Sequence, residues 1–254
     1  MSAQAVRVSS GWLALREPAD AAARSGELAE RLVQHLPAGD LVIHDLGGGS
    51  GAMGRWLAPR LPGPQHWVVH DRDAGLLAHA AAPAGATVET RLTDVTELTP
   101  EDLDGADAVV ASALLDLLTE DELRRMLRAC RGRPMLLALT VAGRVALSPA
   151  DPLDARIEAA FNAHQRRAGL LGPDGVVAAV RALRDADCVM RPSPWRLGPS
   201  DAALAAGWLD GWVAAACEQE PGLDAGAYRE RRLAQAAAGE LAVTVDHADL
   251  LVLP

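Results

Sequence analysis

The chain has 254 residues, half of them apolar, and α/β chains of this length commonly form one domain around one large core. Its formal net charge of −10 argues against a nucleic-acid partner, because nucleic-acid affinity depends mainly on clustered positive charge. All 24 basic residues are arginine, which excludes chemistries that need a lysine, such as a P-loop or a pyridoxal Schiff base.

No apolar run reaches the roughly 18 residues needed to span a bilayer, and the first residues lack a basic segment followed by an apolar one. We therefore expect no membrane partner and a cytoplasmic location. Cys130, Cys188 and Cys217 are widely separated and lack the CxxC spacing of metal or redox sites. They are interpreted as structural thiols, and no metal site is predicted.

The first 36 residues have helical spacing interrupted once at Pro18, which predicts two short helices that meet at a bend. From residue 41 onward, short apolar runs alternate with segments of helical period, which indicates a mostly parallel sheet covered on both faces. The expected strands are 41–46, 66–71, 87–92, 106–114 and 134–141, and the expected helices between them are 51–61, 74–82 and 119–131.

After residue 141 the alternation is interrupted by a polar helical insertion within 146–172. Residues 188–197 are predicted as one strand that carries prolines, which belong at sheet edges, and 242–254 form the expected last strand. Helices are expected at 173–186, 201–219 and 228–239. The pattern predicts a single doubly wound α/β domain over 1–254 with about seven strands, N-terminal helices and an insertion after the fifth strand.

The segment HDLGGGSG places Gly47, Gly49 and Gly51 at alternate positions between a predicted strand and a predicted helix, with Gly48 between them. Glycine permits positive φ and close approach of a ligand to the main chain, while free N–H groups at a helix start favour an anionic group. A tight turn without a ligand is the alternative explanation for the glycines alone.

Two acidic residues end the next predicted strands. Asp71 lies twenty residues beyond Gly51, where a carboxylate can accept hydrogen bonds from ribose hydroxyls. Its alternative role is a helix cap, which Asp73 fits better. Asp94 ends the third strand beside Val95, whose apolar side chain is suited to a purine ring. A simple loop turn is the alternative for Asp94.

These residues resemble the class I S-adenosylmethionine-dependent methyltransferases: DLGGGSG matches the acid-x-Gly-x-Gly-x-Gly motif, and Asp71 and Asp94 fall where the next two motifs are expected. The resemblance covers about residues 36–141 and implies a Rossmann-like fold. It implies that Asp45 and the glycine loop hold the methionine part of S-adenosylmethionine. The further implied cofactor residues are Asp71 with its neighbour Arg72 at the ribose, Asp94 and Val95 at the adenine, and Ser112 at the methyl end.

A dinucleotide-binding oxidoreductase is a weaker alternative. Gly49, Gly51 and Gly54 satisfy the spacing G-x-G-x-x-G. Counted from Gly47, the same spacing fails, because Ala52 stands where the third glycine is needed. The single tyrosine, Tyr228, is followed by RERR, so a tyrosine–lysine pair of the short-chain dehydrogenase type is absent.

The acceptor side carries weaker signals, because methyl transfer from a sulfonium needs mainly alignment and, for some acceptors, removal of a proton. Asp116 and His164 are the candidate catalytic residues, with a helix-start role and a solvated surface position as their alternatives. Trp12, Arg16 and Trp195 are the candidate substrate-binding residues, and packing is the alternative for the tryptophans.

Together these patterns predict methyl transfer to an oxygen or nitrogen of a small molecule by a monomer or homodimer. We expect residues 1–36 to form a lid, 37–141 the cofactor-binding core, and 142–254 the substrate-side insertion and last strands. A non-catalytic cofactor-binding protein with a regulatory or partner function remains the alternative, because no convincing base is visible.

Overall fold

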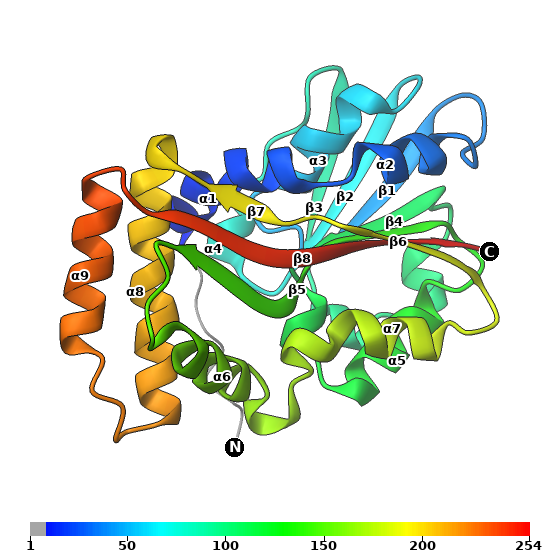
Figure 1. Cartoon of the computed structure of the whole chain (residues 1–254). Coiled ribbons are helices and arrows are strands. Elements are labelled where there is room, and N and C mark those ends of the chain that lie inside the picture. The colour runs from blue at the N-terminus through cyan, green and yellow to red at the C-terminus, as the bar shows by residue number, and fades with distance from the viewer. Residues whose placement is uncertain (1–8) are drawn as a thin grey trace.

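A computed structural model describes residues 9–254, so the first eight residues of the predicted lid lie outside the described part of the chain. These residues form an eight-stranded sheet in the order β3-β2-β1-β4-β5-β8-β6, with β7 paired to β8 (Figure 1). Strands β1 to β5 are parallel, and β8 runs antiparallel to β5, β6 and β7. The strands are β1 (Leu41–Leu46), β2 (Gln65–Asp71), β3 (Ala86–Leu92), β4 (Ala108–Ser112), β5 (Met135–Ser148), β6 (Asp187–Pro192), β7 (Trp195–Leu197) and β8 (Ala242–Leu253).

The helices alternate with the parallel strands and cover both faces of the sheet, so the predicted doubly wound α/β fold is confirmed (Figure 1). The α-helices are α1 (Ser10–Ala23), α2 (Gly26–Val33), α3 (Ala52–Leu57), α4 (Ala74–Leu77), α5 (Glu120–Ala129), α6 (Asp154–Gln165), α7 (Gly175–Ala182), α8 (Ala202–Gln219) and α9 (Gly226–Ala237). Short 3-10 turns include η2 (Val95–Glu97), η4 (Leu115–Leu117) and η6 (Gly172–Asp174).

The predicted bend at Pro18 is wrong. Pro18 lies inside the continuous helix α1, and the chain breaks later, at Arg24, where ψ is 140°. Ser25 then starts α2 by accepting a hydrogen bond from the Leu28 N–H at 3.3 Å. A proline removes one backbone donor and tends to bend a helix, but an N-cap serine starts a new helix outright.

The sequence also predicted one strand over 188–197, whereas the structure has two. Pro192 ends β6, and β7 begins at Trp195 after Ser193 and Pro194. Proline cannot donate to a β-ladder, so the pair of prolines interrupts the pairing with β8. The short β7 accounts for the eighth strand.

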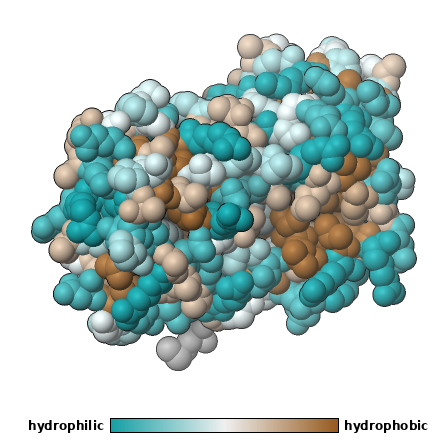
Figure 2. Space-filling model, in the orientation of Figure 1, coloured by the Kyte–Doolittle hydropathy of each residue, from teal (hydrophilic) through white to brown (hydrophobic). Residues whose placement is uncertain are grey.

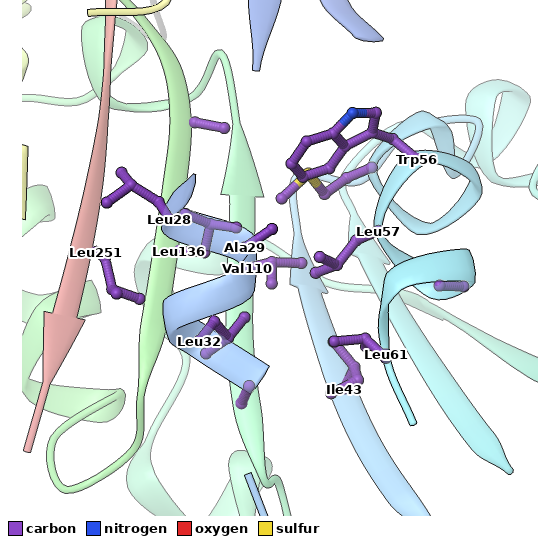
Figure 3. Close-up of a cluster of buried hydrophobic side chains, with 14 of the residues drawn as sticks. Leu28, Ala29, Leu32, Ile43, Trp56, Leu57, Leu61, Val110, Leu136 and Leu251 are labelled. Carbon is purple, nitrogen blue, oxygen red and sulfur yellow. The ribbon is translucent and has the colours of Figure 1, made fainter. Parts of the chain in front are cut away.

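One face of the sheet is sealed by α2 and α3. Leu28 and Leu32 of α2 are fully buried and point toward the strands, where Figure 3 shows them between Leu136 of β5 and Leu57 of α3. Each such leucine contributes about 1.5–3 kcal/mol through removal from water. This packing fixes the segment that follows α1 against the central strands.

The opposite face is covered by α5 and α7. Leu123 and Met126 of α5 and Ala179 of α7 pack with Leu46 of β1 and Leu250 of β8 in a second buried cluster. Leu46 ends β1, so the backbone at the start of the glycine loop is held by core packing on this side.

Strand β5 continues past its predicted end at residue 141 and pairs with β8 from Met135↔Val252 to Ser148↔Ala242, with two irregularities in register. Helices α6, α8 and α9 pack beside this extension and bury a third cluster that includes Trp195 and Trp212 (Figure 1). These substrate-side elements lie next to α1. Trp12 of α1 is so close to Gly207 of α8 that a Cβ added at Gly207 would lie 3.1 Å from the Trp12 ring.

Apolar side chains also reach the surface on the face drawn in Figure 2, in a patch over α7 and β6. Val177, Val180 and Met190 are exposed there. Within residues 9–254, the helices are all too short or too polar to cross a membrane.

Candidate active site

The glycine loop joins β1 to α3 with three glycines in left-handed backbone. The φ angles are 67° at Gly47, 53° at Gly49 and 82° at Gly51. A side chain at these φ values is strained, so the alternate spacing read from the sequence has a conformational cause. The Gly51 N–H donates to the Gly48 carbonyl at 2.8 Å, which closes the turn before α3.

Gly48 is required for a different reason, namely space. A Cβ at this position would lie 2.6 Å from Asp45 Oδ2 and 2.8 Å from Val69 Cγ1. Asp45 itself is fully buried at the end of β1, and neither of its carboxylate oxygens has a hydrogen-bond partner among residues 9–254. Burial raises the pKa of Asp45 to about 7, although the nearby Arg24 opposes that rise. The loop therefore surrounds a carboxylate that has cations nearby but no hydrogen-bonded partner among residues 9–254.

Asp71 ends β2 directly beside this loop. Its Oδ2 accepts a hydrogen bond from the Gly49 N–H at 2.9 Å, and its Oδ1 accepts one from the Asp73 N–H at 2.8 Å. Asp73 caps α4 by accepting from the N–H groups of Gly75 and Leu76, as expected. Each Asp71 oxygen retains acceptor capacity, so the carboxylate can still receive hydroxyl hydrogen bonds.

The remaining residues predicted to bind adenosine make none of the contacts with the glycine loop that Asp71 makes. Arg72 is exposed. Asp94 is exposed and its Oδ1 accepts from the N–H and hydroxyl of Thr96 at 2.9 and 2.8 Å, so it performs the turn role that was its alternative. Val95 is only 8% exposed and packs in the α5-side cluster. Their cofactor roles remain predictions.

Helix α1 lies directly over the glycine loop. A Cβ at Gly49 would lie 3.4 Å from Leu13 Cδ1. Glu17 pairs with Arg55 of α3 at 2.7 Å, and Arg55 also donates to the Ser50 carbonyl at 2.6 Å. A cavity of about 420 Å³ remains between α1 and the loop, lined by Ser10, Gly11, Ala14, Glu17, Ser50, Arg55 and His79.

Behind α1, Arg24 reaches the end of β4. Its Nη2 donates to Ser112 Oγ at 3.1 Å, and its guanidinium lies 5.6 Å from the ring centroid of Trp56. Arg24 is 5% exposed. The predicted site residue Ser112 thus has a cationic partner that the sequence did not identify.

The three predicted substrate-binding residues lie where α1 meets β7 and α8, and they already have partners. Arg16 forms a two-pronged ion pair with Asp20 at 2.9 and 3.1 Å and lies 5.0 Å from the Trp195 ring centroid. The Trp195 Nε1–H donates to Asp20 at 2.9 Å. Trp12 packs against α8 at Gly207. These contacts agree with the packing alternative for the tryptophans and hold α1 in place.

The two predicted catalytic residues are not brought into contact. Asp116 lies in η4, just after β4, and its Oδ1 is buried without a partner among residues 9–254. Burial raises its pKa to about 6. His164 Nε2 instead lies 3.1 Å from Glu218 on α8. The end of the insertion does reach the Asp116 turn, because the Leu171 N–H donates to the Leu118 carbonyl at 2.8 Å.

The backbone is strained at two positions, one just after β4 and one within β5. Ala113 after β4 and Leu139 within β5 have φ of 53° and 55°, where residues other than glycine rarely lie. Asp249 of β8 stabilises the second position by accepting from the Leu139 N–H at 2.8 Å. Strain of this kind concentrates where a fold must shape a site.

Sequence reasoning missed four buried polar residues near α1: Arg24, Asp20, His247 and Asp249. His247 of β8 is 5% exposed, lies 5.4 Å from Trp195 between ring centroids, and has its pKa lowered to about 4 by burial. Polar residues inside the apolar last strand at 247 and 249 are a signal that could have identified two of them. Arg24 and Asp20 carry no comparable signal, because a surface helix is rich in charge.

The region of the chain that contains this site matches a known family. Residues 43–133 match the family model described as "Methyltransferase domain". No curated protein matches the chain.

Solved structures of similar shape include methyltransferases from three bacteria. A putative methyltransferase from an antibiotic biosynthesis pathway of Anabaena variabilis is 12% identical with a TM-score of 0.47, over 92% of this chain and 100% of that one. A putative type II methyltransferase from Anaeromyxobacter dehalogenans is 17% identical with a TM-score of 0.48, over 91% and 96%. An S-adenosylmethionine-dependent methyltransferase from Geobacter sulfurreducens, solved with S-adenosylhomocysteine, is 14% identical with a TM-score of 0.47, over 97% and 98%.

Proposed function

We propose that the chain, whose residues 43–133 match the family model described as "Methyltransferase domain", is a class I S-adenosylmethionine-dependent methyltransferase that methylates an oxygen or nitrogen of a small molecule. The observation that supports this proposal most directly is the half-buried Asp116 beside the end of β4, whose Oδ1 is buried without a hydrogen-bond partner among residues 9–254 and whose pKa is raised. The net charge of −10 argues against a polyanionic acceptor.

The loop fits the methionine end of S-adenosylmethionine. Neither carboxylate oxygen of Asp45 has a hydrogen-bond partner among residues 9–254, and the space a Cβ at Gly48 would fill is kept open beside it. A buried carboxylate without a partner is costly, so a bound ammonium group would relieve that cost. Asp45 and the glycine loop are therefore the proposed site of the methionine part and Asp71 that of the ribose hydroxyls. We retain Asp94, Val95, Arg72 and Ser112 as proposed neighbours of the adenosine and methyl ends.

Bound S-adenosylmethionine would supply a methyl group activated by its sulfonium sulfur. The leaving group is a neutral thioether, so its departure needs no acid from the protein. The contribution required of this chain is to orient the acceptor, to exclude water, and to take a proton where the acceptor carries one. Asp116 suits the last role, because a carboxylate with pKa near 6 is mostly ionised at neutral pH yet more basic than an exposed one.

His164 is the second proposed acid–base residue, and residues 144–172 the proposed roof of the acceptor cavity. The hydrogen bond from Leu171 to Leu118 supports the roof, since it ties the insertion to the turn that carries Asp116. Trp12, Arg16 and Trp195 would then contribute by holding α1 over the site as well as by touching an acceptor.

A screen with methyl-labelled S-adenosylmethionine tests this function. The panel contains small carboxylic acids, phenols, alcohols and amines, and the variants are wild type, Asp116→Asn and the exposed control Asp121→Asn. We expect labelled product with wild type and Asp121→Asn, and a loss of about 100-fold or more in kcat with Asp116→Asn, the usual range for a general base. The kcat/KM of wild type is expected to fall below pH 6.

Tight cofactor binding with no product from any acceptor class would favour the non-catalytic alternative. Equal rates for Asp116→Asn and wild type would remove Asp116 from the mechanism and leave the methyltransferase assignment intact. Binding of NAD in place of S-adenosylhomocysteine would contradict the cofactor assignment itself.

A further inference from the structure

Strand β6 is the last strand of the sheet, and its outer edge is unpaired among residues 9–254. The sheet order ends with β5-β8-β6, so β6 pairs with β8 on one side only (Figure 1). The outer edge of such a strand presents free N–H and C=O groups that can pair with another strand. The donors and side chains of β6 therefore determine which strand this edge can accept.

The register with β8 shows which donors of β6 point outward. The Ser193 N–H donates to the His247 carbonyl at 2.9 Å and continues the β6–β8 ladder by one residue. Successive N–H groups alternate between the two sides of an antiparallel strand. The N–H groups of Cys188 and Met190 therefore point away from β8, toward the open edge.

This open edge is bounded at both ends. Pro192 closes one end, because proline has no N–H to donate. At the other end, the Ala186 N–H already donates to the Leu183 carbonyl at 2.9 Å. A partner strand must therefore match a short stretch whose two outward donors are two residues apart.

A second copy of β6 matches this stretch when the two strands run antiparallel about a twofold axis at Val189. Cys188 of each copy then lies opposite Met190 of the other, as a pair that exchanges both backbone hydrogen bonds. Asp187 of each copy lies opposite Arg191 of the other, and opposite charges in directly facing positions stabilise a pair of strands. The twofold symmetry makes this charge pair occur twice.

The charges select this register over its neighbours. A register centred on Cys188 instead would place Asp187 opposite Val189 and would lose both charge pairs. The Arg191 guanidinium already lies over the open edge, because its Nη1 donates to the Met190 carbonyl at 2.9 Å. A carbonyl oxygen has two lone pairs, so Met190 can still accept a hydrogen bond from a second strand.

An apolar patch lies beside this edge, over α7 and β6 (Figure 2). Met190 is 53% exposed, and Val177 and Val180 of α7 are 51% and 38% exposed. They are three of the six large apolar side chains exposed among residues 9–254. Cys188 Sγ lies 3.8 Å from the Leu183 carbonyl at the end of α7, and Met190 is on the same face of β6 as Cys188. Pairing of two β6 strands would therefore bring two copies of the patch together.

We propose that the chain forms a twofold dimer by antiparallel pairing of β6 with the β6 of a second copy, in which Asp187 of each copy faces Arg191 of the other. The sheet then runs continuously through both subunits. The alternative is that Arg191 and Pro192 keep other strands away from the edge, as charged residues and prolines commonly do. The opposite signs at facing positions and the apolar patch favour a second copy over that alternative.

Sedimentation equilibrium over a range of protein concentrations tests the charge pairs. We expect wild type to form a dimer, and Asp187→Arg to raise the dimer Kd by about tenfold or more because like charges then face each other twice. The double variant Asp187→Arg/Arg191→Asp restores opposite charges and should return the Kd to within about threefold of wild type. Asp185→Arg is the control, since Asp185 precedes β6 and its side chain is 84% exposed.

Val189→Cys tests the register. Facing residues at the axis form a pair without hydrogen bonds, whose Cα atoms lie about 4.5 Å apart, within the range of about 4.4–6.8 Å for a disulfide. Mild oxidation should therefore give a covalent dimer of Val189→Cys on a non-reducing gel. Wild type, which has Cys130, Cys188 and Cys217, is the control for other disulfides.

Three outcomes would overturn the proposal. A monomeric wild type would leave protection of the edge as the role of Arg191 and Pro192. An equal dimer Kd for Asp187→Arg and wild type, or a dimer that oxidation of Val189→Cys does not trap, would place the interface elsewhere on the molecule. None of these outcomes bears on the proposed methyltransferase function, because β6 carries none of its proposed site residues.

Discussion

The Asp249 carboxylate accepts a hydrogen bond from the Ser25 N–H at 2.7 Å, across 224 positions of sequence. Its other oxygen accepts from the Leu139 N–H at 2.8 Å. One buried side chain in the last strand therefore holds both the start of α2 and the strained position in β5. Arg24 immediately precedes Ser25, so the same contact places the buried guanidinium that donates to Ser112.

Replacing Asp249 should destabilise the protein. Asp249→Ala leaves two buried N–H groups without an acceptor, at an expected loss of about 2–5 kcal/mol in the free energy of unfolding. Urea unfolding measures this loss. Asp246→Ala on the same strand is the control and should change stability by less than about 0.5 kcal/mol. Similar losses for the two variants would show that the two hydrogen bonds are not the source of the stability.

Cofactor affinity should depend on pH through Asp45. Its pKa is about 7 without a ligand, and an ammonium partner favours the ionised form, so binding must release a proton from protein molecules in which Asp45 is protonated. Affinity for S-adenosylhomocysteine is therefore expected to be level above pH 7 and to fall toward about tenfold per pH unit well below it. Calorimetry between pH 5.5 and 8 measures the profile. A flat profile for wild type, or the same slope in Asp45→Asn, would disagree with this assignment.

Gly48→Ala tests the space beside Asp45. The added Cβ would meet Asp45 Oδ2 at 2.6 Å and Val69 Cγ1 at 2.8 Å, so the carboxylate must move. We expect a stability loss of about 1–3 kcal/mol from overpacking and at least about a tenfold loss in affinity for S-adenosylhomocysteine.

The matched control is Gly211→Ala. Gly211 is exposed in α8 and has open space where a Cβ would be added, so alanine should stabilise the helix by about 0.5–1 kcal/mol and leave affinity unchanged. Thermal unfolding and calorimetry distinguish the two outcomes. Unchanged affinity in Gly48→Ala would mean that the loop adapts to a side chain.

A buried histidine pair should make the fold sensitive to acid. His44 Nδ1 lies 3.0 Å from His70 Nε2 inside the sheet, and burial lowers the pKa of each to about 4 from 6.5. The unfolded chain therefore binds more protons as pH falls below 6.5. The stability from this pair is fully present above 6.5 and is lost between 6.5 and about 4, at up to about 1.4 kcal/mol per pH unit for each histidine.

Thermal unfolding from pH 4 to 8 measures this effect. The double variant His44→Gln/His70→Gln cannot take up these protons, so its stability should change less steeply with pH, whatever its stability at pH 7. The exposed His35→Gln is the control and should keep the wild-type slope. If the double variant keeps that slope too, the pH sensitivity lies elsewhere in the fold.

The alternation of strands and helices and the glycine loop could be predicted from sequence because local patterns determine them. The spacing of apolar residues along the chain is enough to identify a strand or a helix. The left-handed φ angles at Gly47, Gly49 and Gly51 favour glycine whatever surrounds them. Asp71 followed in the same way, because parallel strands end at one edge of the sheet.

Only the tertiary structure decided what reaches that edge from outside the motif. Arg24 and Asp249 are 225 positions apart in sequence and are brought together by packing of α2 on the sheet and by the position of β8 between β5 and β6. The continuous path of α1 through Pro18, the division of 188–197 into β6 and β7, and the pairing of His164 with Glu218 were likewise set by contacts between distant segments. The sequence by itself determined the fold class and the glycine loop, whereas long-range burial of polar groups determined which side chains could complete the site.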